Sequence, residues 1–268
     1  RSGAADAESA MCLVLIAYRT HPRYPLVLAA NRDEFHARPA QALHWWNDGV
    51  RMLAGRDLQA GGTWLGIDDS GRMALVTNYR DPAIPRPDGV SRGTLIGEFL
   101  GGRADAVGFA HATASRARQF SGFNLLAMEH ECLAYVTSHP EPEVRMLAPG
   151  VYGLSNRQLD TPWPKLLRTR ERFEQELAND HPRPGVLMRV LSDRMTAADE
   201  LLPDTGVGLE WERRLSAPFI VSDNYGTRCS TVVLIGNDGI VTVEERSHAA
   251  DGGVTTRIRI SYQAESPG

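Results

Sequence analysis

The fold is decided by the stretch MCLVLIAYRTHPRYPLVLAANRDEF, which runs from Met11 to Phe35. It holds two apolar runs, Cys12 to Tyr18 and Pro25 to Ala30, on either side of a short polar break. Runs of this length that are rich in aliphatic and aromatic side chains and bounded by turn residues are typical of β-strands. We therefore predict a β-hairpin over this stretch.

Polar residues directly follow the second run: Asn31, Arg32, Asp33 and Glu34. An antiparallel pairing would bring them near Cys12, so we expect this cluster and the cysteine to share one rim of the sheet. Removal of Met11 would make Cys12 a candidate N-terminal nucleophile with an α-amino group that titrates at about pH 8. That amine or Arg32 could lower the pKa of the thiol, which attacks as the thiolate. On position alone, a small buried hydrophobe at the start of a strand is the commoner state of a lone cysteine.

Length and composition indicate one globular domain. The chain has 268 residues, of which 42% are hydrophobic and 23% charged, an ordinary balance for a chain with a sizeable core. We assign the domain to residues 11–262, with a tail at 263–268 and a disordered extension or expression remnant at 1–10. The net charge of −4 argues against the basic face that nucleic-acid binding needs, so we expect a small-molecule partner.

The cysteines and the hydropathy pattern bear on compartment and cofactors. Cys12, Cys132 and Cys229 are odd in number and far apart, without a Cys-x-x-Cys pair, so we expect a reducing compartment, no structural metal and no required cofactor. No apolar run reaches the roughly 18 residues of a membrane span. The first ten residues lack the apolar core of a secretory signal. We therefore expect a cytoplasmic protein.

The rest of the chain alternates hairpins with blocks of helix. Three more hairpins are predicted, over residues 61–79, 124–137 and 230–245, with strands at 151–156 and 254–262. Helices are predicted at 94–100, 105–118, 165–178 and 185–195. We interpret residues 38–48 as irregular, 82–87 as a proline-rich loop, 209–215 as a turn and 222–227 as a polar loop. Such an order predicts an α+β fold with helices layered on antiparallel sheets and disfavours a doubly wound sheet.

With these residues in view, the chain resembles the family named after its Asn-Arg-Asp-Glu motif, the transport-and-Golgi-organisation family. The matching motifs are Met11-Cys12, Asn31 to Glu34, Gly55 to Asp57, Gly61 to Gly66, Thr77 to Arg80, Arg92-Gly93, Gly122 to Leu125, Tyr152 to Asn156, Pro162 to Lys165 and Tyr225 to Val232. The resemblance covers nearly all of residues 11–262. The family is similar in turn to the N-terminal-nucleophile hydrolases, which implies a four-layer αββα sandwich with mainly antiparallel sheets.

The resemblance also implies roles for particular residues. Cys12 matches the nucleophile of those hydrolases, and its α-amine would move the proton. Asn78 and Asn156 match two asparagines that would donate to the oxyanion, and Arg228 matches a late arginine.

On the second strand the chain departs from the hydrolase pattern. Alignment on Phe35 puts Asn31 at the arginine position and Glu34 at the aspartate position. Arg32 is then displaced by one residue, which we expect to turn it to the other face of the strand. Arg32 or Arg228 would tune the thiol and hold a substrate carboxylate.

Two functions follow as expectations. The first is a cysteine N-terminal-nucleophile hydrolase, an amidohydrolase that acts on a non-peptide carbon–nitrogen bond such as an N-acyl amide. The second is a non-catalytic carrier of haem, acyl-coenzyme A or lipid in the same cleft, which rests on the family's links to haem trafficking and lipid metabolism alone. The chain has no Cys-Pro pair and no Cys-x-x-Cys-His, so its residues do not themselves indicate haem. A scaffold with a vestigial site is a third, structural reading.

Overall fold

The opening hairpin forms as predicted and starts the first of two sheets. The computed structural model describes residues 11–83 and 90–265. In it β1 (Met11–Tyr18) pairs antiparallel with β2 (Leu26–Phe35), with Cys12 opposite Arg32. The second strand is longer than predicted, because β11 (Tyr225–Ile235) pairs with its far side as far as Phe35. The polar cluster Asn31 to Glu34 therefore lies inside a central strand and not beyond its end.

The first sheet places this hairpin near its centre. Among the described residues it has six strands in the order β10-β1-β2-β11-β12-β13, all antiparallel to their neighbours. The remaining bounds are β10 Gly150–Leu154, β12 Ile240–His248 and β13 Val254–Gln263. The pair β11 and β12 confirms the hairpin predicted at the Asn-Asp-Gly turn.

The second sheet is a simple meander. Its order β3-β4-β5-β6-β7-β8-β9 follows the chain. The bounds are β3 Ala40–Trp45, β4 Leu53–Asp57, β5 Leu65–Ile67, β6 Met73–Asn78, β7 Phe123–Glu129, β8 Cys132–Thr137 and β9 Glu143–Met146. Both remaining predicted hairpins, β5 with β6 and β7 with β8, are present.

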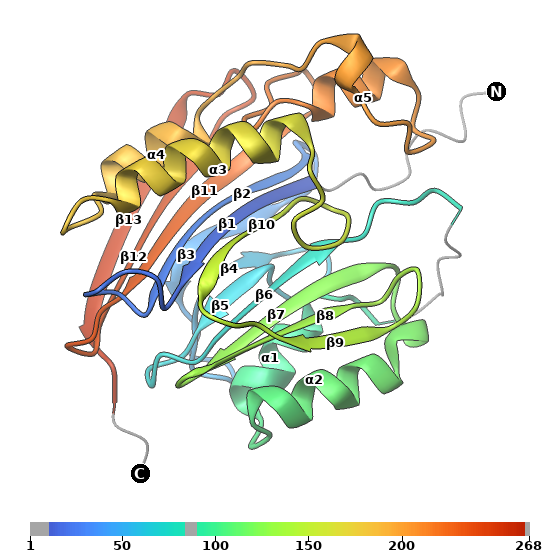
Figure 1. Ribbon diagram of the computed structural model, residues 1–268. Helices are drawn as coiled ribbons and strands as arrows, with labels where there is room; N and C mark the ends of the chain where they lie inside the picture. The colour runs from blue at the N-terminus through green and yellow to red at the C-terminus, as the bar shows by residue number, and fades with distance from the viewer. Residues whose placement is uncertain (1–10, 84–89, 266–268) are drawn as a thin grey trace.

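Helices cover the outer face of each sheet (Figure 1). The first sheet carries α3 (Pro164–Leu177) and α4 (Pro184–Leu191), with α5 (Leu209–Leu215) at one end, and the second carries α1 (Thr94–Gly101) and α2 (Ala106–Ser115). Short 3₁₀ turns lie at Ala117–Gln119 and Asp199–Leu201. The predicted α+β class and its four-layer αββα arrangement are confirmed.

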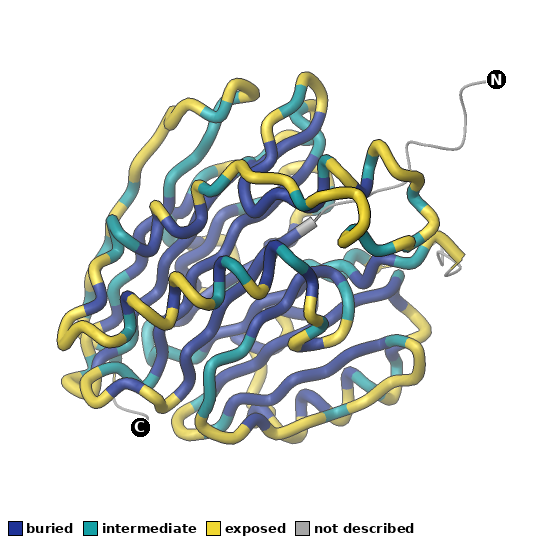
Figure 2. Tube along the Cα trace, turned by 45° about the horizontal axis from the view of Figure 1, so that its top comes forward, coloured by how far each residue is buried: buried dark blue, intermediate teal, exposed yellow. Residues whose placement is uncertain are grey.

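The pleat of β1 divides the core into layers. Val14 and Ile16 pack between the two sheets, whereas Leu13 and Leu15 pack under the helices. Successive side chains of a strand point to opposite faces, so a strand covered on both faces is apolar throughout. Figure 2 shows the result, with buried central strands and exposed outer helix surfaces.

Four local predictions were wrong or incomplete. Residues 38–48 hold β3, an edge strand whose half-buried positions lack a clean apolar alternation. Residues 209–215 form α5 and not a turn, and β11 begins inside the predicted loop 222–227. The strand β9 was not predicted, because its four residues are mostly exposed at a sheet edge. Most of the predicted loop 82–87 lies outside the described residues.

No helix in the part of the chain that the structure describes is long and apolar enough to cross a membrane.

Candidate active site

The pleat of β2 separates the polar cluster into two pairs. Asn31 points toward the helix layer, where its side-chain amide donates to the carbonyl oxygens of Leu191 (2.9 Å) and Pro218 (2.8 Å). Asp33 also leaves the Cys12 face, and its carboxylate accepts a 2.6 Å hydrogen bond from Thr227. The expectation that all four residues share a rim with Cys12 is therefore wrong for these two side chains.

Arg32 and Glu34 form the other pair, on the same face as Cys12. Arg32 lies directly opposite Cys12 in the strand register, and directly opposed residues share a face. The predicted displacement of Arg32 to the far face is wrong, because the register of β1 and β2 decides the face and not the spacing to Phe35. All three side chains line one pocket.

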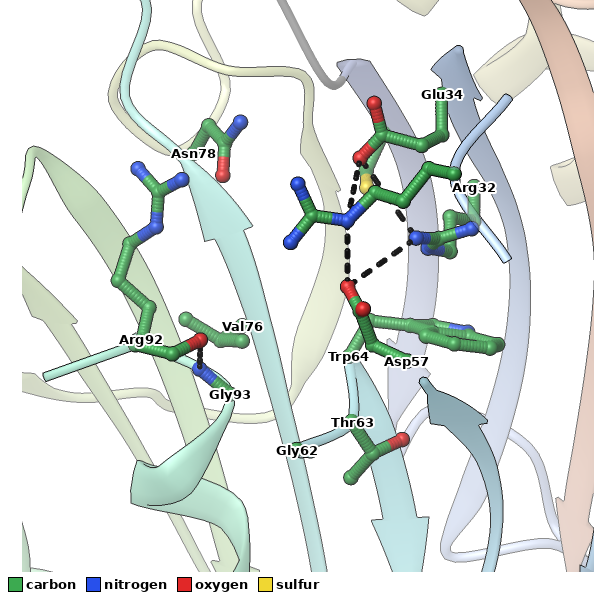
Figure 3. A pocket seen from close by; sticks show the side chains of 13 residues that line it. Arg32, Glu34, Asp57, Gly62, Thr63, Trp64, Val76, Asn78, Arg92 and Gly93 are labelled. Carbon is green, nitrogen blue, oxygen red and sulfur yellow. Dashed lines mark hydrogen bonds and ion pairs between the residues drawn. The ribbon is translucent and has the colours of Figure 1, made fainter. Parts of the chain in front are cut away.

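The pocket opens between the two sheets and measures about 580 Å³ including its mouth. Its lining residues come from both sheets and from the loop before α1: Cys12, Arg32, Glu34, Arg38, Asp57, Gly62, Thr63, Trp64, Val76, Asn78, Ser91, Arg92 and Gly93. Figure 3 shows Asn78 and Arg92 on one side and the group around Glu34, Asp57 and Trp64 on the other. A bound molecule would lie between these two walls.

Two arginines and two carboxylates form a buried ionic network on one wall. Arg38 Nε lies 2.7 Å from Asp57 Oδ2 and 3.6 Å from Glu34 Oε2. Arg32 Nη2 lies 3.6 Å from each of the same two oxygens. The dashed lines of Figure 3 trace these contacts. Each carboxylate is therefore shared by two guanidinium groups, which fixes all four side chains.

Arg32 keeps one donor unused within this network. Its guanidinium carbon lies 4.4 Å from the centre of the Trp64 ring, a cation–π contact. Its Nη1 is buried and has no hydrogen-bond partner among the described residues. A buried donor without a partner is costly, so Nη1 is suited to a group that enters the pocket.

Asp57 owes its charge to the turn that follows β4. Burial raises the pKa of this carboxyl, but hydrogen bonds from the Ala60 main-chain amide and the Arg38 side chain outweigh burial and hold the pKa below its usual range. The Gln59 amide donates to the same carboxylate oxygen as the Ala60 amide, at 3.0 Å each. Asp57 is therefore ionised and anchors the arginines.

The Cys12 thiol is protonated at rest. Burial, together with the negative charges of Asp33 and Glu34, outweighs Arg32 and raises the pKa of Cys12 to about 12. Its main-chain nitrogen donates a 2.8 Å hydrogen bond to Oδ1 of Asn156. Attack by this sulfur would require a base that removes the proton as the substrate arrives.

Asn156 and Asn78 come together as the resemblance implied, although in a different arrangement. The Asn156 side-chain amide donates to the carbonyl oxygen of Asn78 at 3.1 Å, and its oxygen accepts from Cys12. Both polar ends of Asn156 are therefore used in positioning Cys12 and β6. Asn78 itself lines the pocket.

Arg228 lies at a bulge of β11, and its side chain donates hydrogen bonds to main-chain carbonyl oxygens. The register of β2 and β11 shifts between Thr227 and Cys229. Nη1 of Arg228 donates to the carbonyl oxygens of Phe35, His36 and Arg38 at 2.9, 3.2 and 3.0 Å. The arginine stabilises the turn that carries Arg38 and is not among the pocket-lining residues that the structure describes.

Several pocket residues had no role assigned from sequence: Arg38, Asp57, Thr63, Trp64, Arg92 and Gly93. Most lie in motifs of the resemblance, Gly55 to Asp57, Gly61 to Gly66 and Arg92-Gly93. Their position in these motifs was therefore the sequence signal that could have identified them as pocket residues. Within the described ranges, no group of three or more His, Cys, Asp or Glu side chains could hold a metal ion.

Comparison with known families places the chain. Residues 11–250 match the sequence model of the family Transport and Golgi organisation 2. The chain belongs to this family. It is 36% identical over 259 residues to the "Transport and Golgi organization protein 2 homolog" of Bos taurus and 33% identical over 257 residues to that of Homo sapiens. Each match covers 88% of this chain and 93% of the relative.

Solved structures show likenesses at low sequence identity. The Caenorhabditis elegans orthologue of N-acylethanolamine-hydrolyzing acid amidase matches with a TM-score of 0.49 and 10% identity, over 83% of this chain and 92% of that one. A mutant of the conjugated bile acid hydrolase from Clostridium perfringens matches with a TM-score of 0.49 and 8% identity, over 96% and 93%. Likenesses of this size say nothing about the chemistry of the pocket.

Proposed function

We propose that this member of the Transport and Golgi organisation 2 family hydrolyses a non-peptide carbon–nitrogen bond, such as that of an N-acyl amide, with Cys12 as the nucleophile. One observation carries the proposal. Cys12 lines the pocket while its main-chain nitrogen is held at 2.8 Å by Asn156 Oδ1. The sulfur that would attack and the nitrogen that would become its base thus belong to one residue of the pocket lining.

The α-amine of Cys12 would be the base. Cleavage of the Met11–Cys12 bond would turn the nitrogen that Asn156 holds into an amine, which titrates far closer to neutral pH than the buried thiol. The thiol proton passes to this amine as sulfur attacks the carbonyl carbon. The amine then gives the proton to the leaving nitrogen as the carbon–nitrogen bond breaks, and water hydrolyses the thioester.

Arg32 and Asn78 would stabilise the charge that develops on the carbonyl oxygen. Arg32 Nη1 is a buried donor on the Cys12 face without a partner among the described residues, and Asn78 lines the opposite wall. One such donor contributes about 3 kcal/mol to transition-state stabilisation when it is preorganised. Arg32 thus takes the oxyanion role expected for Asn156, whose side-chain amide donates to a main-chain carbonyl oxygen. Arg228, expected to tune the thiol and hold a substrate carboxylate, donates to main-chain carbonyl oxygens instead.

Charge favours a substrate that carries a carboxylate or phosphate. On one wall of the lining, Arg32 and Arg38 contact the two carboxylates of Glu34 and Asp57. Arg32 Nη1 remains a buried cationic donor with no acceptor among the described residues, and a carboxylate or phosphate oxygen would supply one. Trp64 and Val76 add apolar surface for an acyl chain.

Two forms of the protein test the proposal. One begins at Cys12, and the other retains residues 1–11. Each is incubated with N-acyl amides that differ only in a terminal carboxylate, and amine release and the mass of the acylated chain are measured. We expect turnover only from the form that begins at Cys12, with faster turnover of the carboxylates. Cys229→Ala, at another buried cysteine, is the control and should keep activity. Amine release by Cys12→Ala at the wild-type rate would remove Cys12 from the mechanism.

A carrier of acyl-coenzyme A, lipid or haem is the second candidate. It is favoured by the burial of the Cys12 thiol, which raises its pKa and so disfavours the attacking thiolate. Haem fits the donor set less well, since Cys12 is, among the described lining residues, the only side chain of a type that commonly serves as an axial ligand. Quenching of tryptophan fluorescence by palmitoyl-coenzyme A or haemin, unchanged in Cys12→Ala and without amine release in either form, would favour a carrier. The cytoplasmic location stays a prediction.

A further inference from the structure

A second, smaller pocket lies on the helix side of the first sheet, where α3 begins. It measures about 210 Å³ including its mouth. It is lined by Arg80, Trp163, Pro164, Lys165, Pro203, Glu212, Leu215 and Ser216. Trp163 and Leu215 belong to the apolar cluster beneath the helices, so this pocket is separate from the one that Cys12 lines.

Two cations in this pocket have buried donors that lack partners within residues 11–83 and 90–265. Lys165 is 1% exposed and Arg80 is 6% exposed. Lys165 Nζ and two nitrogens of Arg80, Nε and Nη1, find no hydrogen-bond acceptor among the described residues. Buried cationic donors are normally paired, so these atoms mark a place where an acceptor is missing.

The nearby carboxylates do not fill that place. Glu212 contacts only Nη2 of Arg80, at 3.5 Å, and its other oxygen accepts from Thr205. Asp33 acts electrostatically on Lys165, but in the described part of the chain the two form no ion pair within 4.0 Å, and Asp33 does not line the pocket. Among the described residues, Asp33 Oδ2 is itself a buried oxygen without a hydrogen-bond partner, and no carboxylate accepts from Lys165 Nζ or from Nε and Nη1 of Arg80.

The start of α3 adds a further attraction for negative charge. Pro164 occupies the first turn, and no side chain of the described residues caps the helix. The first turn of a helix carries unpaired N–H groups and the positive end of the helix dipole. Trp163 also stacks on Arg80, with the guanidinium carbon 4.4 Å from the ring centre, which fixes the direction of its donors.

We propose that this pocket is a second binding site, for a small oxyanion such as a carboxylate or phosphate group, held by Lys165 and Arg80 at the start of α3. The proposal does not depend on hydrolase activity. It would nevertheless connect to Cys12, because the main-chain nitrogen of Arg80 donates to the carbonyl oxygen of Asn156 at 2.6 Å, and Asn156 holds Cys12.

Binding should depend on pH through Lys165. The titratable groups that act on it are Asp33 from β2, Arg80 after β6, Cys12 from β1 and Glu212 from α5. Burial lowers the pKa of Lys165, although Asp33 opposes this. An anion would favour the ammonium form and raise this pKa, so binding takes up protons and tightens as the pH falls toward neutrality and below.

Calorimetric titration at low ionic strength tests the site, with sodium acetate and inorganic phosphate as separate probes for a carboxylate and a phosphate. We expect saturable binding of at least one probe. Acetate, whose charge is constant in this range, should bind more tightly at about pH 6 than at about pH 8 if it is the probe that binds. Lys165→Met and the paired neutral variant Arg80→Gln with Glu212→Gln should each weaken binding by about tenfold or more, because each removes a charge-assisted hydrogen bond.

Two controls locate the anion. Arg168→Gln removes a cation from the same helix outside the pocket and should leave affinity unchanged. Arg32→Gln, which alters the Cys12 pocket alone, should keep the binding event that Lys165→Met weakens, whereas loss of all saturable binding in Arg32→Gln would move the anion to the Cys12 pocket and overturn the proposal. Absence of saturable binding, or equal affinity in Lys165→Met, would overturn it as well.

A measurement on the unaltered chain covers the case in which the variants do not fold. In a nuclear magnetic resonance titration with the same two probes, the signals of the Arg80 Nε–H and the Trp163 indole should shift with saturation. Shifts confined to Trp64 and Arg32 would contradict the proposal.

Discussion

Asn156 Oδ1 accepts a 2.8 Å hydrogen bond from the main-chain nitrogen of Cys12, 144 residues away in the sequence. The amide nitrogen of the same side chain donates to the carbonyl oxygen of Asn78, at the end of β6. Cys12 belongs to the first sheet and Asn78 to the second. One asparagine therefore ties the two sheets together at the pocket that Cys12 lines.

Two substitutions at Asn156 should separate the stability contributed by its two hydrogen bonds from the cost of backbone strain. Asn156 has a φ of 56°, a left-handed conformation that asparagine and glycine tolerate better than alanine. Asn156→Ala should destabilise the protein by about 2–4 kcal/mol, from unpaired buried groups and about 1 kcal/mol of strain. Asn156→Gly loses the same bonds without the strain and should cost less in urea unfolding. An equal or larger loss for the glycine variant would refute the strain argument.

Reactivity of the Cys12 thiol should depend on whether its nitrogen is free. In a chain that retains residue 11, iodoacetamide should modify Cys12 slowly at neutral pH, with a rate that rises toward the pKa of about 12. A chain that begins at Cys12 should react faster near pH ~8, because the amine can accept the thiol proton. Cys132, which is half-buried, provides the internal reference for each mass-spectrometric time course. Identical Cys12 rates in both chains would exclude activation by the amine.

The fold was largely predictable because its central strands are covered on both faces. Cys12 to Tyr18 and Ser230 to Ile235 are nearly continuous apolar runs, and their short length, their β-branched or aromatic residues and the turn residues that bound them favour strands over helices. The edge strands β3 and β9 were not predicted, because each is paired on one side only and is partly exposed. Their hydrophobic pattern is therefore weak.

The candidate site was less predictable, since it depends on register and on stacking of the two sheets. Spacing to Phe35 placed Arg32 on the wrong face, whereas its pairing with Cys12 places it in the pocket. Asp57 and Trp64 come from the second sheet and its turns. They reach Arg32 only because the two sheets pack face to face. The spacing of residues along the sequence does not predict this packing.

Because of Asp57, the free energy of unfolding should fall as the pH becomes acidic. Its pKa is lower in the folded protein than the ordinary 3.8, so the stabilisation it gives is full above that value and is lost as the pH falls through the folded pKa. Asp57→Asn removes one charge-assisted bond to Arg38 and should cost about 1.5–3 kcal/mol near pH ~7. Urea unfolding from neutral to acid pH should show this difference shrinking below the ordinary pKa.

The matched control for this variant is Asp48→Asn, at an exposed carboxylate that pairs with Arg56. It should change stability little at any pH, since exposed ion pairs are screened by water and salt. A constant difference between the wild type and Asp57→Asn across the acid range would show that charge is not what Asp57 contributes.

A pair of glycines should respond in opposite ways to alanine. A methyl group at Gly55 would overlap the Trp64 ring and lie 3.2 Å from the Gln41 carbonyl oxygen, so Gly55→Ala should push Trp64 away from Arg32. At Gly97, inside α1, a methyl group meets nothing within 4 Å among the described residues, and Gly97→Ala should stabilise the protein by about 0.5–1 kcal/mol through helix propensity. Urea unfolding and tryptophan fluorescence measure both effects. An unchanged tryptophan spectrum in Gly55→Ala, with stability equal to the wild type, would show that Trp64 does not need this glycine to lie beneath Arg32.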